Sequence, residues 1–211
     1  MPTLTETTRE EMRAILARYP RPRSALMPLL HLVQSVEGRL SDESIAEVAE
    51  LVGVTPVEAT AVASFYTMYS RRPQGRNHLG VCTNTLCAVL GGDAVWESLS
   101  DHLGVGHHET TPDGEITLER IECQAACTHA PVLTANWEYV DNVTVERAKE
   151  IADALRTGGD VTSTRGPRVR PLAEVQRVLA GFDDGLAGDG GGADTIMRAG
   201  TDRAAADDGE G

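Results

Sequence analysis

Residues 81–87 read VCTNTLC, and residues 122–127 read ECQAAC. These two stretches hold all four cysteines of the chain: Cys82, Cys87, Cys123 and Cys127. Four residues separate the first pair, three separate the second, and 35 residues lie between the pairs. The N-terminus, MPTLTETTREEM, lacks the features of an export or mitochondrial signal, so we expect reduced thiols in a prokaryote-like cytosol. Metal or redox chemistry then explains the cysteines better than disulfides.

Each cysteine pair directly follows a predicted β-strand. Residues 78–82 form the first short strand, and Ile116, Leu118 and Ile121 mark a second strand that ends near Cys123. In an α/β sheet, ligands gather beyond the carboxyl ends of the strands. If the two strands are parallel neighbours, their loops converge, and we expect the four thiolates to face one another.

Three interpretations of the thiols stay open from spacing alone. A 2Fe–2S cluster takes four thiolates and tolerates varied spacing. Structural zinc also takes four sulfurs, although its sites usually contain a tighter C-x2-C knuckle. Redox-active thiols favour C-x-x-C and need only one pair, and inert buried cysteines are the remaining option. The polar residues Thr83, Asn84 and Thr85 can donate hydrogen bonds to sulfur, and the small Ala125 and Ala126 let backbone amides approach, which favours the cluster.

The first part of the chain reads as a small helical bundle. Capping signals predict four short helices, with N-caps at Thr8, Ser24, Ser41 and Thr55. We expect the fourth helix to run toward Tyr69. Short links between such helices are typical of a bundle. The turn-rich RRPQGRNH at 71–78 marks a boundary, so the first domain is predicted at residues 1–72.

The pattern changes to α/β in the second domain, predicted at residues 73–157. Its order is β-α-β-β-β-α, with a helix at 93–103, a hairpin at 131–140 and a last helix capped by Thr144. This order matches a compact thioredoxin-type layout. Thioredoxin-like folds often place a cis proline beside the active loop, and we predict one at Ala130-Pro131.

Residues 158–211 hold 12 of the 21 glycines and are predicted as a flexible C-terminal extension. One amphipathic piece within it, Leu172 to Phe182, accompanies four arginines. Two interpretations of this piece stay open: it folds against a partner subunit, or it is weakly structured.

The bulk composition excludes several classes of partner. The formal net charge is −13, with 32 acidic and 19 basic residues. Such a surface repels polyanions, so we expect no nucleic-acid partner. Since the chain has no run of eighteen apolar residues, we also expect no direct membrane span.

Taken in order, four stretches closely resemble one family: the 24-kDa subunit, also called the E subunit, of respiratory complex I, the bacterial NADH–quinone oxidoreductase. The stretches are YPRPRSALMPLLHLVQSVEGRLSDESIAEVAELVGVTP, SFYTMY, VCTNTLC and IECQAACTHAPV, and the resemblance covers about residues 15–157. It implies a helical N-terminal domain followed by a thioredoxin-like ferredoxin domain with one 2Fe–2S cluster, whose ligands fall by position on Cys82, Cys87, Cys123 and Cys127. One departure is visible: many relatives have Leu-Gly-Ala where this chain has Gln124-Ala125-Ala126, which puts the loop conformation in question.

The resemblance also implies a function and partners. The chain shows no phosphate loop and no G-x-G-x-x-G after a strand, so NADH and FMN sites are not expected in it. The family instead places both in a neighbouring flavoprotein subunit, with which the cluster exchanges electrons. The implied enzyme is proton-translocating NADH:quinone oxidoreductase, and this chain supplies no catalytic residue to it. The implied location is a peripheral arm, on the cytoplasmic side of the inner (plasma) membrane.

Two alternatives stay open beside this function. One is the diaphorase subunit of an NAD-linked hydrogenase or formate dehydrogenase. The other belongs to a different class, a structural zinc-binding assembly module. We expect His107, His108 and His129 to be surface or loop residues, because four thiolates already complete a cluster.

Overall fold

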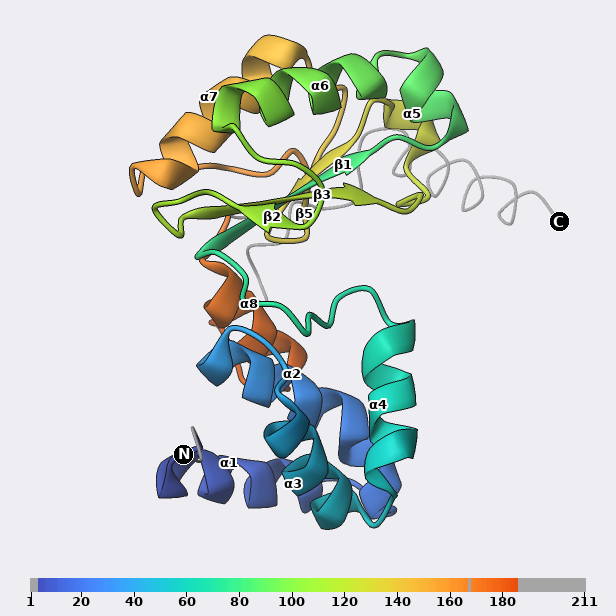
Figure 1. Ribbon diagram of the computed structural model, residues 1–211, viewed down its shortest axis with the longest axis vertical. Coiled ribbons are helices and arrows are strands. Elements are labelled where there is room, and N and C mark those ends of the chain that lie inside the picture. The colour runs from blue at the N-terminus through green and yellow to red at the C-terminus, as the bar shows by residue number, and fades with distance from the viewer. Residues whose placement is uncertain (1–3, 167, 186–211) are drawn as a thin grey trace, which may run out of the picture.

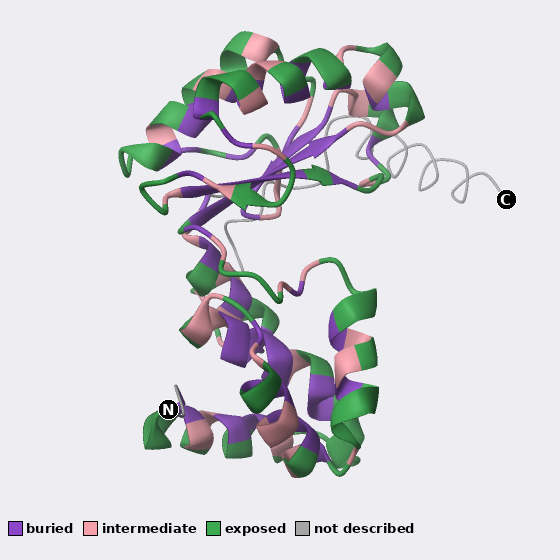
Figure 2. Cartoon of the chain, viewed as in Figure 1, coloured by how far each residue is buried: buried purple, intermediate pink, exposed green. Residues whose placement is uncertain are grey.

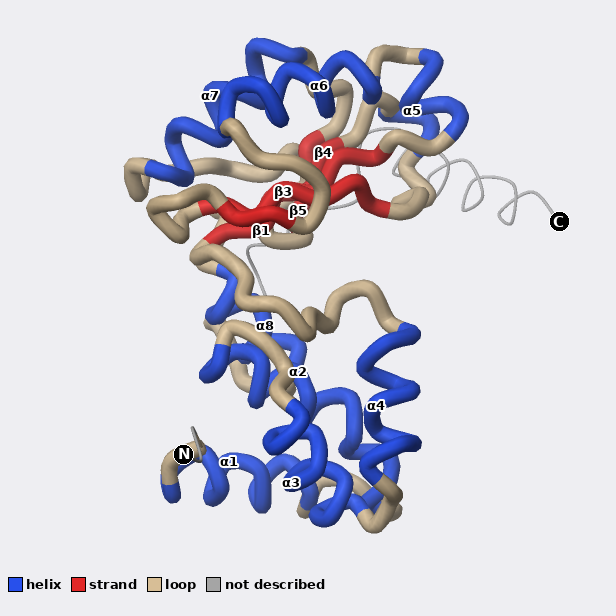
Figure 3. The backbone as a smooth tube through the Cα atoms, in the orientation of Figure 1, coloured by secondary structure: helices blue, strands red, loops and turns tan. Residues whose placement is uncertain are grey.

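The computed structural model describes residues 4–166 and 168–185. Figure 1 shows two bodies stacked along the long axis, one made of helices and one built on a sheet. Each body has its own buried apolar cluster, which is why the buried positions in Figure 2 form two separate groups. Helices occur in both bodies, whereas all the strands in Figure 3 belong to one of them.

The helical body contains the four helices that the capping signals predict. They are α1 (Glu6–Leu16), α2 (Leu26–Glu37), α3 (Asp42–Val52) and α4 (Pro56–Phe65), with a 3-10 turn at Pro22–Ala25 before α2. Ser41 and Thr55 cap α3 and α4 as expected, each through a reciprocal capping box. Within the described residues, no single helix is long and apolar enough to cross a membrane; α3 and α4 pass such a test only jointly, with a bend of 114° between them.

Three boundaries in this body differ from the predictions. The cap of α1 is Thr5, whose hydroxyl accepts from the Thr8 amide, because the helix begins one turn earlier and buries Thr8. Ser24 lies inside the 3-10 turn and caps nothing, since the turn leads directly into α2. The last helix, α4, stops at Phe65, because Tyr66 has extended backbone angles.

The sheet body has the thioredoxin-like order that the sequence predicts, with two short elements added. Its strands are β1 (Asn77–Cys82), β2 (Glu109–Thr110), β3 (Ile116–Ile121), β4 (Leu133–Ala135) and β5 (Glu138–Val140), and its helices are α5 (Thr85–Val89), α6 (Gly92–Leu103) and α7 (Val145–Arg156). The sheet order is β2-β3-β1-β4-β5. The condition for convergence of the two loops is met: β1 and β3 are parallel neighbours, and Cys82 lies opposite Ile121 at their carboxyl ends.

The two faces of the sheet have different partners. Helices α6 and α7 cover one face (Figure 1). Leu79 and Val81 of β1 belong to the apolar cluster beneath these helices. Because side chains alternate along a strand, His78, Gly80 and Cys82 point to the opposite face.

The described residues after α7 pack onto both bodies, unlike the flexible extension that the sequence predicts. Helix α8 (Leu172–Leu179) lies against α2, to which the buried Gln176 is joined by a bond of 2.5 Å between its Oε1 and Nδ1 of His31. An ion pair between Arg177 and Glu11 adds a contact with α1. Helix α8 is therefore an integral part of the helical body. Residues 186–211 of the predicted extension lie outside the described residues.

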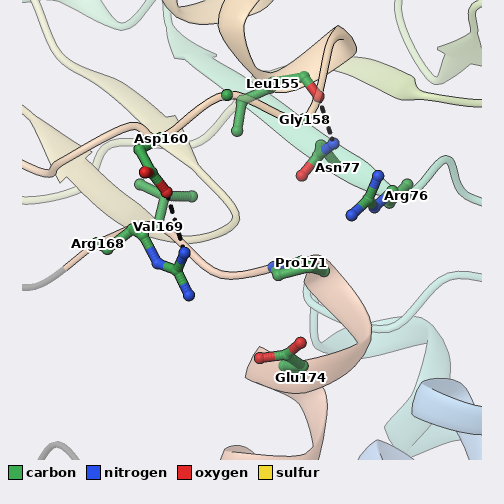
Figure 4. A pocket seen from close by; sticks show the side chains of 10 residues that line it. Arg76, Asn77, Leu155, Gly158, Asp160, Arg168, Val169, Pro171 and Glu174 are labelled. Carbon is green, nitrogen blue, oxygen red and sulfur yellow. Dashed lines mark hydrogen bonds and ion pairs between the residues drawn. The ribbon is translucent and has the colours of Figure 1, made fainter.

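A polar pocket of about 200 Å³ lies where the two bodies meet (Figure 4). Asn77 lines it, so the pocket is at the amino end of β1, the opposite end from Cys82. Inside it, the Arg168 guanidinium lies 3.0 Å from the Asp160 carboxylate. This pairing neutralises the charge of Arg168 within the pocket.

Candidate metal centre

The carboxyl ends of β1 and β3 bring the cysteine loops to one edge of the sheet. Cys82 is the last residue of β1, and Cys123 follows β3 by two residues. The short helix α5, which the sequence analysis missed, turns the chain back so that the buried Cys87 joins Cys82. Cys127 begins a 3-10 turn that leads to the Ala130–Pro131 bond, which is cis as predicted.

The two thiol pairs differ in exposure. Cys82 and Cys87 are 1% and 4% exposed. They share a small apolar cluster of their own with Ile121, Ala126 and Val132. Cys123 and Cys127 are exposed, and their sulfurs lie 3.9 Å apart. One half of the site is therefore enclosed by protein, and the other half forms part of the surface.

The neighbouring sulfurs raise the pKa values of Cys87 and Cys127. Burial, followed by the hydrogen bond with Cys82, raises the pKa of Cys87 to about 11, and Cys127 adds to this rise. The hydrogen bond with Cys123 and the negative charge of a Cys123 thiolate raise the pKa of Cys127, and Cys82 contributes again. Ala126 of the second loop packs in the same buried cluster as Cys82 and Cys87, so the two loops converge. A bound metal reverses this preference for the protonated thiol by stabilising the thiolate.

The donor set fits a 2Fe–2S cluster better than a single ion. Within residues 4–166 and 168–185, no three His, Cys, Asp or Glu side chains are grouped closely enough to hold one metal ion. The sulfurs are arranged as two pairs instead, which suits two irons with two thiolates each. A single tetrahedral zinc ion needs all four sulfurs around one point.

Asn84 is the polar neighbour that reaches a thiol. Its Nδ2 lies 3.7 Å from the Cys82 sulfur and donates to the Ile121 carbonyl at 3.1 Å. The side chain thus ties the loop after β1 to the end of β3, as well as donating toward sulfur. This confirms one of the three sulfur donors that the sequence predicts.

Backbone conformation shapes both loops. A Cβ atom at Gly92 would lie 2.6 Å from the Cys82 carbonyl oxygen, so only glycine permits the approach of α6 to the first loop. In the second loop, Ala125 has φ +55°, in the left-handed region that favours glycine. The second loop therefore makes a left-handed turn at an alanine, without the conformational freedom of glycine.

The histidines singled out by the sequence do not join the thiols. His107 accepts a hydrogen bond from the Arg120 amide, and its ring centroid lies 3.7 Å from that of His108. His129 contacts the Thr128 hydroxyl at 2.9 Å.

Two aromatic residues beside the site and a buried histidine were not predicted from the sequence. Trp137 and Tyr139 pack against the apolar cluster around Cys82 and Cys87. His78 is fully buried, stacks on Trp137, and lies with its Nε2 2.7 Å from Glu119. The signal that could have found His78 is strand alternation, which places it on the same face as Cys82.

The parallel strands, the covering helices and the edge with four thiols together define a thioredoxin-like ferredoxin. The family model for the thioredoxin-like 2Fe-2S ferredoxin matches residues 12–156, and the chain belongs to this family. The fold class and the 2Fe–2S cofactor predicted from the sequence are thereby confirmed.

Two similar relatives of the chain are subunits of NADH-quinone oxidoreductases. The chain is 52% identical over 174 residues to the E subunit of NADH-quinone oxidoreductase from Mycobacterium bovis, covering 82% of this chain and 69% of the relative. It is 43% identical over 145 residues to NADH-quinone oxidoreductase subunit 2 of Thermus thermophilus, covering 67% and 80%. The resemblance to the 24-kDa subunit family, found from the sequence, is thus confirmed.

A solved structure of an NAD+-reducing NiFe-hydrogenase shares the fold. Its TM-score is 0.57 at 20% sequence identity, and the match covers 65% of this chain and 23% of the hydrogenase chain. At this identity, the likeness concerns the fold alone.

Proposed function

We propose that this chain is the electron-transferring 24-kDa subunit of an NADH–quinone oxidoreductase, and that its four cysteines hold one 2Fe–2S cluster. The convergence of the two cysteine loops at the carboxyl ends of β1 and β3 carries this proposal. The 52% identity to the mycobacterial relative supports the same function. When bound, the cluster accepts and releases one electron at a time.

Each half of the site has its own task in this function. Cys82 and Cys87 anchor the buried side of the cluster. Their apolar surroundings exclude water and so lower the local dielectric constant. Cys123 and Cys127 hold the exposed side, where an electron can enter or leave. Asn84 donates toward the Cys82 sulfur and so stabilises negative charge there.

The partner that we propose is the flavoprotein subunit that binds NADH and FMN. Helix α5 and the residue after it expose three apolar side chains beside the cysteine loops: Leu86, Val89 and Leu90. An exposed apolar patch of this kind is typical of a protein–protein contact. With the flavoprotein on this patch, the chain lies in a peripheral arm on the cytoplasmic side of the inner (plasma) membrane.

The proposed domain division follows the sequence, with boundaries after residues 72 and 157. The two separate apolar clusters support the first boundary. In this division, residues 158–211 are the extension, whose α8 docks on α2 within the chain. If this segment also binds a partner subunit, it does so through the outer face of α8, where Val178 and Leu179 are exposed.

The alternatives are less well supported. The hydrogenase structure, at 20% sequence identity, supports only a shared fold. The mycobacterial E subunit, at 52% identity, favours the NADH–quinone oxidoreductase. A zinc-binding assembly module is disfavoured by the arrangement of the thiols as two pairs.

Anaerobic purification followed by iron, sulfide and zinc analysis tests the proposed function. We expect about two irons and two sulfides per chain, and an EPR signal after dithionite reduction. Serine at any one of the four cysteine positions should lower the iron content or change the signal. A colourless protein that contains one zinc ion per chain would overturn the redox function.

A further inference from the structure

Tyr139 of β5 reaches into the second cysteine loop. Its hydroxyl donates to the Gln124 carbonyl oxygen at 3.1 Å, and Gln124 directly follows Cys123. The ring packs against the apolar cluster that surrounds Cys82 and Cys87. Tyr139 thus contacts the backbone of one thiol loop and the surroundings of the other.

The Tyr139 ring is itself held from outside. Arg165 lies over it, with Cζ 4.3 Å from the ring centroid. The same guanidinium makes two bonds of 2.7 Å to the Asp141 carboxylate. Thr164 donates its amide to the Tyr139 carbonyl at 2.9 Å and its hydroxyl to Asp141 at 2.9 Å. We call Tyr139, Asp141, Thr164 and Arg165 the Tyr139 strut.

An ion pair between Asp141 and Arg165 stabilises the Tyr139 strut at neutral pH. Burial alone raises the pKa of Asp141, whose side chain is 8% exposed, but the hydrogen bonds from Arg165 and Thr164 outweigh it, and the pKa is lowered. Asp141 is therefore ionised beside Arg165. A planar guanidinium that binds a carboxylate through two parallel bonds has a defined orientation, which fixes its stacking on Tyr139.

The hydroxyl of Tyr139 controls more than one atom of the loop. In a trans peptide, the carbonyl and the following N–H point in opposite directions. The bond to the Gln124 carbonyl therefore sets the direction of the Ala125 N–H. Ala125 lies in the left-handed region, a conformation that alanine does not favour on its own, so the turn benefits from an external hold.

We propose that Tyr139 is a positioning residue for the loop that carries Cys123 and Cys127, and that Arg165 and Asp141 orient it. This inference rests on the proposed function, in which these cysteines hold the cluster. It also gives a role to Thr164 and Arg165, which lie in the segment that the sequence assigns to a flexible extension.

Two matched substitutions test the strut in the full-length protein with its cluster. Tyr139→Phe removes only the hydroxyl that reaches Gln124. Tyr69→Phe is the control, because Tyr69 donates in the same way to the Met27 carbonyl, at 2.9 Å, but in the helical body. Loss of one neutral hydrogen bond corresponds to about a threefold to tenfold change in an equilibrium or rate.

For Tyr139→Phe we expect full iron and sulfide content, a shifted midpoint potential, an altered EPR line shape, and cluster loss to a chelator that is about threefold to tenfold faster. For Tyr69→Phe we expect a wild-type potential and line shape. Arg165→Lys keeps the charge but loses the planar stacking, so it should shift both readouts in the same direction as Tyr139→Phe. A Tyr139→Phe protein with wild-type potential, line shape and chelation rate would overturn the inference and leave the proposed function intact. A wild-type protein without iron would overturn the proposed function instead.

Discussion

Gly92, the first residue of α6, lies so close to Cys87 that a Cβ atom at position 92 would stand 2.8 Å from the Cys87 carbonyl oxygen. The neighbouring atoms are backbone atoms of Cys82 and Cys87, which cannot move aside as the end of a flexible side chain can. The position of α6 and the shape of the first thiol loop therefore depend on each other.

Gly92→Ala is expected to displace this loop. Because overpacking against fixed backbone costs about 1–3 kcal/mol, the free energy of unfolding should fall by that amount and the iron content should fall with it. Urea unfolding and iron analysis measure the two effects. Gly106→Ala is the control, since its nearest neighbour is the flexible Glu109 side chain at 3.3 Å. Equal behaviour of the two variants would contradict the prediction.

Ala125→Gly is expected to stabilise the protein. Ala125 has φ +55°, which costs an L-residue about 1–2 kcal/mol, and glycine removes that cost while losing part of it in chain entropy. We expect a net gain of up to about 1 kcal/mol in thermal or urea unfolding. Ala126 offers a control in the same loop, because its φ of −108° lies outside the left-handed region. Ala126→Gly should therefore lower stability, and a loss of stability in both variants would count against strain at Ala125.

The fold and the thiol site could be predicted because their signals are local. The strand patterns before each cysteine pair placed Cys82 and Cys123 at strand ends, whereas the parallel pairing of β1 and β3, left as a condition by the sequence, comes from the structure. The capping boxes at Ser41 and Thr55 are likewise written within four residues each. Such signals do not depend on knowing what lies across the molecule.

The features that escaped prediction depend on distant partners or on very short elements. The docking of α8 joins His31 to Gln176, which are 145 residues apart, and an amphipathic stripe does not say which surface will cover it. The two-residue β2 and the five-residue α5 are too short to show a hydrophobic periodicity in the sequence. Tyr139 gains its role from Gln124 and Arg165, to which no sequence motif connects it.

Val89→Asp is expected to weaken assembly with the flavoprotein. The side chain of Val89 is 77% exposed beside the cysteine loops, and a carboxylate there must be desolvated when a partner covers it. We expect at least a tenfold weaker association in a binding measurement with the purified flavoprotein, with an unchanged cluster EPR signal.

Val57→Asp is the matched control for that experiment. Val57 is 78% exposed, but it lies on α4 of the helical body, away from the thiols. Its substitution should leave association with the flavoprotein close to wild type. If Val57→Asp weakened binding and Val89→Asp did not, the docking face would have to be moved from α5 to α4.

Docking of α8 is expected to weaken at acidic pH through His31. Burial lowers the pKa of His31, although its hydrogen bond to Gln176 acts in the other direction. In the unfolded chain the imidazole takes up its proton near pH 6.5, so below that pH the unfolded state binds more protons and stability falls, by at most about 1.4 kcal/mol per pH unit for one such group. Burial also lowers the pKa of His107, which contributes in the same sense, so the comparison must be with a variant. His31→Gln should lose stability less steeply between pH 7.5 and 5 in urea unfolding, and the protection factors of the α8 amides against hydrogen exchange should fall with acid in the wild type alone. Parallel pH profiles for the two proteins would show that His31 does not control this contact.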